Sequence, residues 1–391
     1  MSYMNESNYL RRVKGFAETL KKAYGGSFQA RADLKEAAIS TSDFPTLFTD
    51  VTTVQLQEQY QLAEDQLWKK FARRLVVPNF LPQSMVDLGW DDSAMDNLLA
   101  ENGGAPTVEG TLPVIPEGTE YPTAFKLYSS KEQIETRKNG ARVPVTFETF
   151  INDQWGVLEE IPSALTRAAL KSEDVAVTKM LVDVDGTGLN KANFNKANGT
   201  LLKFGQNTEG TVALTRDTLK AALQQANAFK AGPNKNRPVT FTKFAVVIPQ
   251  ALKAVADEIS EMPTAITITE GNISYVKNFT YGVDFEFVVN PYLDQINRTT
   301  GETAWFVVPF AGEGTRASLG LTFLENFELP ELRVHNDTGM LLSGGDVNPR
   351  HGSFRNDTWE IRIRHIYDGA SLNEMIGCVG STGVEAPKLD K

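Results

Sequence analysis

The clearest alternation of polar and apolar side chains lies near the C-terminal end of the chain. Trp359, Ile361 and Ile363 occupy every second position, and the residues between them are polar or charged. Successive side chains of a strand point to opposite faces, so a period of two indicates one apolar and one charged face. The pattern therefore predicts a two-faced strand over residues 358–364.

A second alternating segment covers residues 134–149, and a shorter strand-like run precedes it at residues 121–128. Asn139-Gly140 lies inside the longer segment, and Asn-Gly is the commonest tight turn of a β-hairpin. We therefore expect a long hairpin in this region. Because a two-stranded hairpin is marginal in water by itself, it should be stabilised by another part of the protein or by another subunit.

Helical spacing is strongest over residues 157–183, where apolar side chains recur at Leu158, Ile161 and Leu165 and continue beyond them. Gly186 follows this pattern and is expected to stop the helix. The segment from 163 to 183 would form a helix about 30 Å long at a rise of 1.5 Å per residue.

The remaining chain mixes short elements behind a polar N-terminal stretch that is typical of an arm. Residues 46–77 have roughly helical spacing, and Pro78 ends it. Further helices are expected at residues 217–230, 249–260 and, as a short one, 319–327; strands are expected at residues 244–248, 265–269, 283–289 and 305–308.

Composition and charge limit the kinds of protein to which this sequence can belong. The chain has 391 residues, 41% of them hydrophobic and 23% charged, with a net charge of -10. These values fit a folded protein of about two or three compact units, and the acidic charge argues against tight binding of nucleic acid. Residues 1–36 differ, because their seven basic and four acidic residues give a net charge of +3. Such a segment is either a solvated helix or an arm that touches an anionic partner.

Familiar chemical motifs are missing from the sequence. None of the three histidines, His335, His351 and His365, has a second His or Cys at the spacing of a metal site. The single cysteine, Cys378, excludes an internal disulfide and is expected to be a small buried hydrophobe. Residues 312–317 fit the loose G-x-G-x-x-G/A form but lack the long helix that a dinucleotide site requires. We therefore expect no enzyme, no metal and no cofactor, and no apolar run is long enough to span a membrane.

Several segments, taken in order, resemble the major capsid proteins of tailed bacteriophages. They include a glycine- and proline-containing entry to an extended loop, a returning strand, a long helix and a late strand that precedes a glycine. The residues that carry the resemblance are 117–122, 140–148, 158–182, 305–309, 324–332 and 354–364. Together they span about residues 45–380 of the chain.

This resemblance implies an α+β, HK97-like capsid fold with an N-terminal arm, an extended β-hairpin loop, a peripheral domain with a long spine helix, and an axial domain. The implied boundaries are 1–100 for the arm and helices, 101–150 for the extended loop, 151–188 for the spine helix, 189–320 for the axial domain, and 321–391 for the peripheral strands and the C-terminal return to the axial domain.

The resemblance also implies a function. A major capsid protein would form pentamers and hexamers of the icosahedral head of a tailed double-stranded DNA phage. It would be assembled in the bacterial cytoplasm and found in the virion. Its implied partners are a separate scaffolding protein, a portal and a decoration protein, with weak contact to packaged DNA at the inner face and no membrane. The alternatives are an encapsulin-like nanocompartment shell, a soluble enzyme with an unrecognised site, and another part of the virion.

The loop region supplies the candidate contacts between subunits, which are Lys126, Lys131, Arg137, Lys138 and Asn139. Some capsid relatives join neighbouring subunits through an isopeptide bond between a loop lysine and an asparagine, and Asn356 is the conceivable partner here. Exposed lysines that keep the protein soluble are the simpler interpretation, and we expect no such bond.

Overall fold

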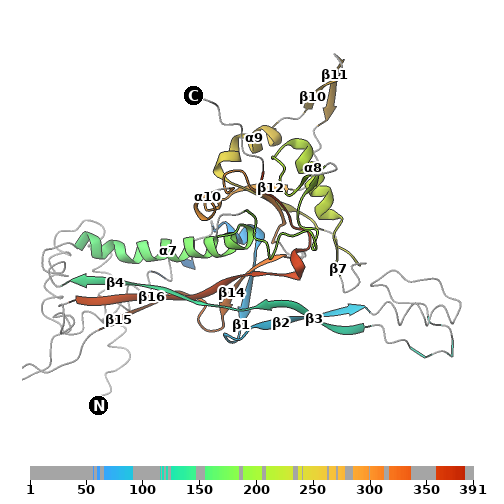
Figure 1. Cartoon of the computed structure of the whole chain (residues 1–391). Coiled ribbons are helices and arrows are strands. Elements are labelled where there is room, and N and C mark those ends of the chain that lie inside the picture. Colours follow the sequence, from blue (N-terminus) through green and yellow to red (C-terminus); the bar gives the residue numbers. More distant parts are fainter. Residues whose placement is uncertain are drawn as a thin grey trace, which may run out of the picture. The chain divides into compact units, whose positions relative to one another are not determined.

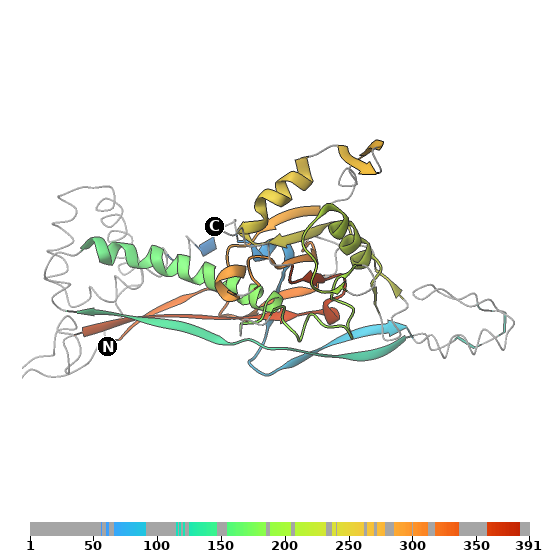
Figure 2. The same ribbon diagram turned by 45° about the horizontal axis from the view of Figure 1, so that its top comes forward.

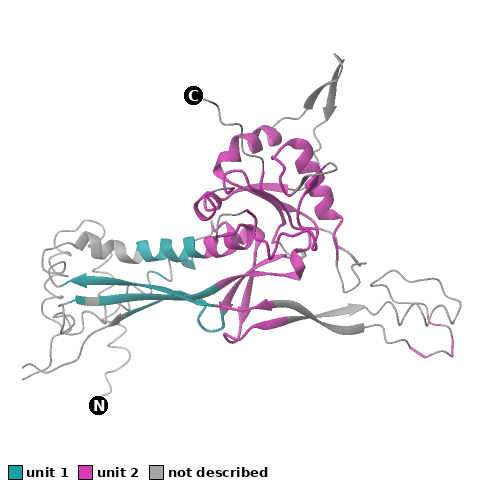
Figure 3. Ribbon diagram, in the orientation of Figure 1, with its two compact units in different colours: residues 1–65, 137–172, 324–367 teal, residues 66–136, 173–323, 368–391 magenta. Residues whose placement is uncertain are grey.

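The computed structural model describes residues 56, 60–61, 66–90, 115, 117–118, 120–121, 125–146, 155–184, 188–204, 208–231, 237–239, 241–261, 264–269, 272–277, 285–298, 300–311, 317–335 and 358–383. The chain divides into two compact units, each built from separate stretches of sequence (Figure 3). Unit 1 comprises residues 1–65, 137–172 and 324–367, and unit 2 comprises residues 66–136, 173–323 and 368–391.

Unit 1 is built around the long strand β16 (Thr358–Ser371), whose first ten residues belong to this unit. Strands β4 (Lys138–Thr146) and β15 (Glu331–His335) pair with β16 in antiparallel register, one on each side. The N-terminal part of helix α7 (Trp155–Leu181) lies along these strands in two views (Figures 1 and 2).

The core of unit 2 is a four-stranded sheet in the order β12-β9-β13-β17. Every residue of β9 (Phe244–Ile248) and of β13 (Trp305–Pro309) is buried, which explains why both read as continuous apolar runs. Strand β12 (Phe285–Val289) is parallel to β9, whereas β17 (Val379–Ser381) is antiparallel to β13.

Helix α8 (Arg216–Asn227) packs on this sheet and begins at a reciprocal capping box. Thr215 precedes the helix, and its side chain accepts a hydrogen bond from the backbone amide of Thr218, whose hydroxyl in turn accepts one from the amide of Thr215. Leu219 and Leu223 of the helix belong to the same apolar cluster as Trp305 of the sheet. The other helices that the structure describes wholly within unit 2 are short: α4 (Trp68–Phe71), η1 (Gln250–Leu252), α9 (Lys253–Glu261), α10 (Leu293–Ile296) and η3 (Asn373–Met375).

Strands β2 (Gln83–Trp90) and β3 (Phe125–Ile134) of unit 2 form a separate antiparallel pair, which extends away from the four-stranded sheet (Figures 1 and 2). Strand β1 (Arg73–Val77) precedes the pair and borders β14 (Leu319–Leu324). Further short pairs among the described residues of the unit are β5 (Lys203–Phe204) with β6 (Thr208–Glu209), β7 (Lys230–Ala231) with β8 (Arg237–Pro238), and β10 (Thr264–Thr269) with β11 (Asn272–Lys277).

Many of the predicted elements are confirmed. The long helix is found as α7, and the two-faced strand is found within β16. The predicted helices at 217–230 and 249–260 correspond to α8 and to η1 with α9, and the strands expected at 244–248, 265–269, 283–289 and 305–308 are found as β9, β10, β12 and β13.

The predicted turn at Asn139-Gly140 is wrong. Both residues lie within β4, where they pair with His365 and Arg364 of β16. The hairpin is instead formed by β3 with β2, and Phe125 pairs with Trp90. Local preference for a tight turn is overridden here, because the residues on both sides of Gly140 complete a ladder with a strand more than 200 residues away.

Two further predictions are wrong. Residues 319–324 form strand β14 and not a short helix, and all six are buried. A short run that is apolar on both faces cannot be assigned by periodicity alone, which explains this error. The helix expected up to residue 77 is replaced by β1 over Arg73–Val77, where two adjacent valines favour a strand. Residues 1–55 of the predicted arm, residues 312–316 and Asn356 lie outside the described residues.

Candidate functional site

The three strands of unit 1 form a sheet with two different faces. Val145, Leu332, Ile361 and Ile363 lie on one face and are buried. His365 lies on the same face, is 4% exposed, and has the ring of Tyr60 packed edge-on against it at a centroid distance of 5.6 Å. This face is therefore covered within unit 1, and the opposite face carries the charged side chains.

On the opposite face, three arginines form one row across the sheet. Arg362 of β16 is directly opposite Arg142 of β4 on one side and Arg333 of β15 on the other. Neighbouring strands are about 4.8 Å apart, so three positive charges stand at close spacing. Like charges directly opposite each other destabilise a sheet, and such a row requires compensating groups.

Two carboxylates of the same face compensate part of this charge. Arg142 donates to Glu360 with an N–O distance of 3.1 Å, and Arg333 donates to Glu331 at 2.8 Å. Arg364 also donates to Glu331 and lies over the ring of Phe327 at 5.3 Å from its centroid. The side chain of Arg142 remains 70% exposed, so its ion pair contributes little to stability.

Glu331 is held in its charged form by these arginines. Desolvation raises the pKa of this carboxyl group, but hydrogen bonds from Arg333 and Arg364 outweigh that effect, and the pKa lies below its ordinary value. Glu331 is therefore a stable anion that serves two of the four arginines of the face.

Arg362 is exposed, and within the part of the chain that the structure describes it has no carboxylate at ion-pair distance. We define the charged face as Lys138, Arg142, Glu331, Arg333, Glu360, Arg362 and Arg364, all of which share one side of the sheet by register. Five cations and two anions leave this surface positive on a chain whose net charge is -10.

The second distinctive surface is the β2–β3 hairpin with its connection to β1. Phe80 is 51% exposed and Leu81 is 69% exposed in the turn that leads into β2. An Asx turn fixes this segment, because the side-chain oxygen of Asn79 accepts a hydrogen bond from the backbone amide of Leu81 at 3.0 Å. Tyr121, near the start of β3, is 83% exposed. Phe80 and Leu81 adjoin the Gln83–Ile134 end of the ladder, whereas Tyr121 adjoins the Trp90–Phe125 end, so exposed apolar side chains flank both ends of the hairpin.

The residues predicted as subunit contacts fall on different elements. Lys126 and Lys131 lie in β3 of the hairpin, and Arg137 lies in the connection between β3 and β4. Lys138 is exposed at the start of β4 and belongs to the charged face. Asn139 is already engaged inside the subunit, because its amide donates to the backbone carbonyls of Arg137 and Tyr367. A role for these five residues between subunits stays a prediction.

A buried polar cluster of unit 2 tethers the segment that precedes β1. The carboxylate of Glu173 accepts hydrogen bonds from Gln66 at 2.7 Å and from the indole of Trp68 at 3.0 Å, and Glu173 is 0% exposed. Asp174 accepts from the backbone amide of Trp68 at 3.0 Å. Burial, together with the neighbouring Glu173, raises the pKa of Asp174 from 3.8 to about 6, although the hydrogen bond from the backbone amide of Trp68 lowers it. These contacts are structural, since each acceptor is satisfied by the protein itself.

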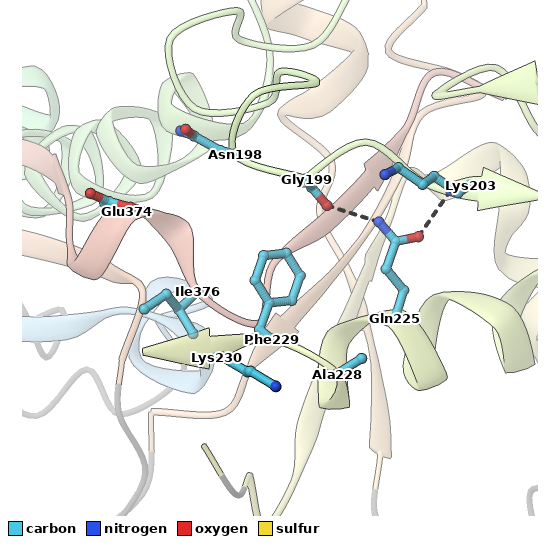
Figure 4. A pocket seen from close by; sticks show the side chains of 9 residues that line it. All are labelled: Asn198, Gly199, Lys203, Gln225, Ala228, Phe229, Lys230, Glu374 and Ile376. Carbon is cyan, nitrogen blue, oxygen red and sulfur yellow. Dashed lines mark hydrogen bonds between the residues drawn. The ribbon is translucent and has the colours of Figure 1, made fainter. Parts of the chain in front are cut away.

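An open hollow of about 290 Å³ lies beside α8 (Figure 4). The side chain of Gln225, which lines the hollow, is already bound to the backbone: it donates to the carbonyl of Gly199 at 2.8 Å and accepts from the amide of Lys203 at 2.9 Å.

Cys378 is fully buried, and desolvation raises the pKa of its thiol to about 12, as expected for a small hydrophobe and not for a nucleophile. Among the described residues, no group of three or more His, Cys, Asp or Glu could hold a metal ion, and no helix is long and apolar enough to cross a membrane.

Comparison of the sequence with models of known protein families shows which family the chain belongs to. Residues 130–374 match the model of a family described as phage capsid protein, and this match covers more than half of the chain. The chain belongs to the phage capsid protein family. It is therefore a structural component of a virion, and proteins of this kind assemble into an oligomeric shell.

Solved structures similar to this capsid protein include chains from two phages and from an encapsulin complex, all with low sequence identity. One from Microbacterium phage Oxtober96 is 14% identical, with 80% of this chain and 89% of that chain covered and a TM-score of 0.43. One from Mycobacterium phage Patience is 12% identical, with 88% and 89% covered and a TM-score of 0.44. The holo-SrpI encapsulin complex from Synechococcus elongatus is also 12% identical, with 68% and 80% covered and a TM-score of 0.39. Among curated proteins, none matches this chain in sequence.

Proposed function

We propose that this capsid protein forms pentamers and hexamers of the icosahedral head of a tailed phage, with an HK97-like arrangement of parts. The observation that carries the proposal is the β2–β3 pair, a two-stranded sheet that is separate from the other sheets of the described chain. Such a pair is marginal in water by itself. Packing against sister subunits supplies the missing stabilisation and at the same time links the shell.

The parts of the chain receive roles accordingly. Unit 2, with its four-stranded sheet, serves as the axial domain near the centre of each capsomer. Unit 1, with β4, β15, β16 and the first half of α7, serves as the peripheral domain. The exposed Phe80 and Leu81 at the base of the hairpin become covered by a neighbour. A closed lattice requires many such contacts, and permanent interfaces commonly bury about 2,000 Å² or more.

The remaining functional assignments follow the same proposal. The chain acts as a structural protein without catalysis, is assembled in the bacterial cytoplasm, and uses a scaffolding protein, a portal and a decoration protein as partners. Packaged double-stranded DNA touches the inner face weakly, because the net charge of -10 does not favour strong phosphate binding.

The register of the hairpin permits a sharp test of its role. Val86 and Ser129 are direct partners within the ladder, so replacing residues 87–128 with an Asn-Gly turn removes most of the hairpin and leaves the other described strand pairs in place. We expect the shortened subunit to fold with unchanged circular dichroism and to fail to form shells in electron micrographs. Normal shells from the shortened chain would contradict the proposal.

A control variant separates folding from assembly. Shortening the β10–β11 pair instead, by replacing residues 267–274 with Asn-Gly between the partners Ile266 and Tyr275, changes a different hairpin and should leave assembly intact. DNA inside particles from infected cells would distinguish a phage head from an encapsulin-like shell, which would contain a protein cargo.

A further inference from the structure

We propose that the hollow beside α8 binds a short acidic segment of a second protein, and that a large apolar side chain of this segment enters the hollow. Nine residues line the hollow, and all of them belong to unit 2 (Figure 4). Pockets for small ligands commonly have about 300–1,000 Å³, so a hollow of about 290 Å³ has room for one or two side chains and not for a large cofactor. The inference goes beyond the proposed function, because it assigns a partner to a surface of the single subunit.

The apolar part of the lining rests on the core of unit 2. It consists of Ala228, Phe229 and Ile376, and the last two pack against the buried cluster that contains Trp305. Phe229 and Ile376 are only half-buried, so part of each side chain is still in contact with water. An apolar side chain that enters the hollow extends this core, and removing apolar surface from water favours its binding.

One wall of the hollow is held in place by Gln225. Its side-chain amide donates to the carbonyls of Gly199 at 2.8 Å and of Leu201 at 2.7 Å, and its oxygen accepts from the backbone amide of Lys203 at 2.9 Å. These three hydrogen bonds fix residues 199–203 against α8. A site whose shape is fixed before binding loses less entropy when a partner binds.

A strained turn contributes to the lining as well. Asn373, Glu374 and Met375 have φ values of 53°, 52° and 56°, and each non-glycine residue in this left-handed region costs energy. The fold holds the turn on both sides of Glu374, because Asn373 donates to the carbonyl of Ala317 at 3.1 Å and Met375 is 1% exposed. Strain that the fold maintains is concentrated at binding sites, and Glu374 lines the hollow.

The charge of the lining indicates an acidic partner. Lys203 and Lys230 are exposed, and in the part of the chain that the structure describes no carboxylate lies at ion-pair distance from either ammonium group. Together with Glu374, the two lysines give the lining a net charge of +1, on a chain whose net charge is -10. Carboxylates on both sides of an apolar side chain match this arrangement, and complementary charge directs a partner to the site.

The size and chemistry of the hollow favour a second protein over the other occupants. A contact that takes one or two side chains is small and reversible, whereas copies within a shell share permanent interfaces of about 2,000 Å² or more. Nucleic acid would supply phosphates for Lys203 and Lys230 but no aliphatic or aromatic side chain for the apolar part of the lining. An acidic peptide segment satisfies both parts.

A peptide probe tests the inference on the purified full chain. The probe is a blocked pentapeptide with a central para-fluorophenylalanine and two aspartates on each side, and broadening of its fluorine NMR signal measures binding. An unlabelled peptide with a central phenylalanine should displace the probe. The same peptide with a central alanine should compete about tenfold less well, because the buried ring is lost. A version with lysines in place of the aspartates should not compete.

Charge variants of the lining provide the first comparison. Lys203→Glu combined with Lys230→Glu should weaken binding of the probe by about tenfold or more, because both cations of the lining are reversed. Lys220→Glu combined with Lys253→Glu makes the same charge change at exposed positions outside the hollow and should alter binding by less than about twofold at physiological salt. Glu374→Gln should tighten binding by about threefold, because it removes a carboxylate that repels the probe.

A second variant fills the hollow and leaves the core side chains in place. Ala228 is exposed and lines the hollow, so Ala228→Trp should abolish binding of the probe while the unfolding temperature stays unchanged. Ala251→Trp adds the same ring at an exposed position outside the hollow and should bind the probe like the original chain.

Four results would overturn the inference. Equal binding by the two double-lysine variants, or by Ala228→Trp and Ala251→Trp, would show that the probe binds elsewhere. Equal competition by the alanine and phenylalanine peptides would show that only charge is recognised. Stronger competition by oligothymidylate than by the acidic peptide would assign the hollow to nucleic acid. Loss of shells in Ala228→Trp alone would assign it to contacts between copies, and normal shells from the original chain would still support the proposed function.

Discussion

A side chain at Gly140 has no room, because an added Cβ would overlap the backbone carbonyl oxygen of Ile363 on the neighbouring strand β16. A backbone atom in the middle of a ladder cannot move without disturbing the strand pair. The close approach explains why a glycine occurs in β4, where a strand otherwise disfavours it.

Gly140→Ala should therefore lower the stability of unit 1. We expect a loss of about 1–3 kcal/mol in the free energy of unfolding, the range typical of overpacking. Urea denaturation of the unassembled subunit measures this loss. Ala141→Ser, at the next and exposed position, should change the stability by less than about 0.5 kcal/mol. Equal effects of the two substitutions would show that β4 does not pair with β16 in this register.

Glu173 should be required for the stability of unit 2. Glu173→Ala removes the acceptor of two buried donors, the amide of Gln66 and the indole of Trp68. We expect a loss of about 2–4 kcal/mol, because both donors are left without a partner. Glu173→Gln keeps an acceptor oxygen of the same size and should lose clearly less. Chemical denaturation followed by tryptophan fluorescence compares the two variants. An alanine variant as stable as the original chain would show that Glu173 does not satisfy the two buried donors.

Asp174 should make the subunit less stable as the pH rises. Burial raises the pKa of its carboxyl group in the folded protein to about 6, above the ordinary value of 3.8. Folding thus favours the protonated form. The stability that this protonation gives the folded subunit is complete below about pH 4 and is lost as the pH rises through 6.

The variant Asp174→Asn keeps an oxygen acceptor for the amide of Trp68 and removes the titration. The difference in unfolding free energy between this variant and the original chain should shift in favour of the variant by about 2–3 kcal/mol between pH 4 and pH 7.5, since one pKa unit corresponds to about 1.4 kcal/mol. Thermal or urea unfolding of unassembled subunits across this range measures it. A difference that does not vary with pH would refute the raised pKa.

The N-terminal segment should be protected in the shell. Residues 1–36 carry a net charge of +3 on an acidic chain, and we expect them to face the interior, where the DNA is held. Trypsin added to intact particles should leave this segment uncut, whereas unassembled subunits should lose it, as followed by mass spectrometry. Rapid removal of the segment from intact particles would place it on the outer surface.

Elements with a long or regular pattern could be predicted from the sequence. The 27-residue helix α7 and the alternating part of β16 show periods of 3.6 and 2 over enough residues to be unambiguous. Strand β14 was missed because residues 319–324 are apolar without a period, and a strand buried on both faces has no such signal.

Pairing between distant strands could not be predicted in the same way. Asn139-Gly140 has the local chemistry of a turn, and only the ladder with β16 shows that it is part of a strand. The row of Arg142, Arg362 and Arg333 was missed for the same reason: each arginine is visible in an alternating pattern, but their alignment depends on the register of three strands.

The most direct measurement is electron cryomicroscopy of particles assembled from the full chain together with its scaffolding protein, at a resolution that traces individual strands. We expect a closed lattice of pentamers and hexamers in which the β2–β3 hairpin of each subunit lies on an adjacent copy. Discrete monomers, or a hairpin folded back onto its own subunit without contact to a neighbour, would contradict the central claim.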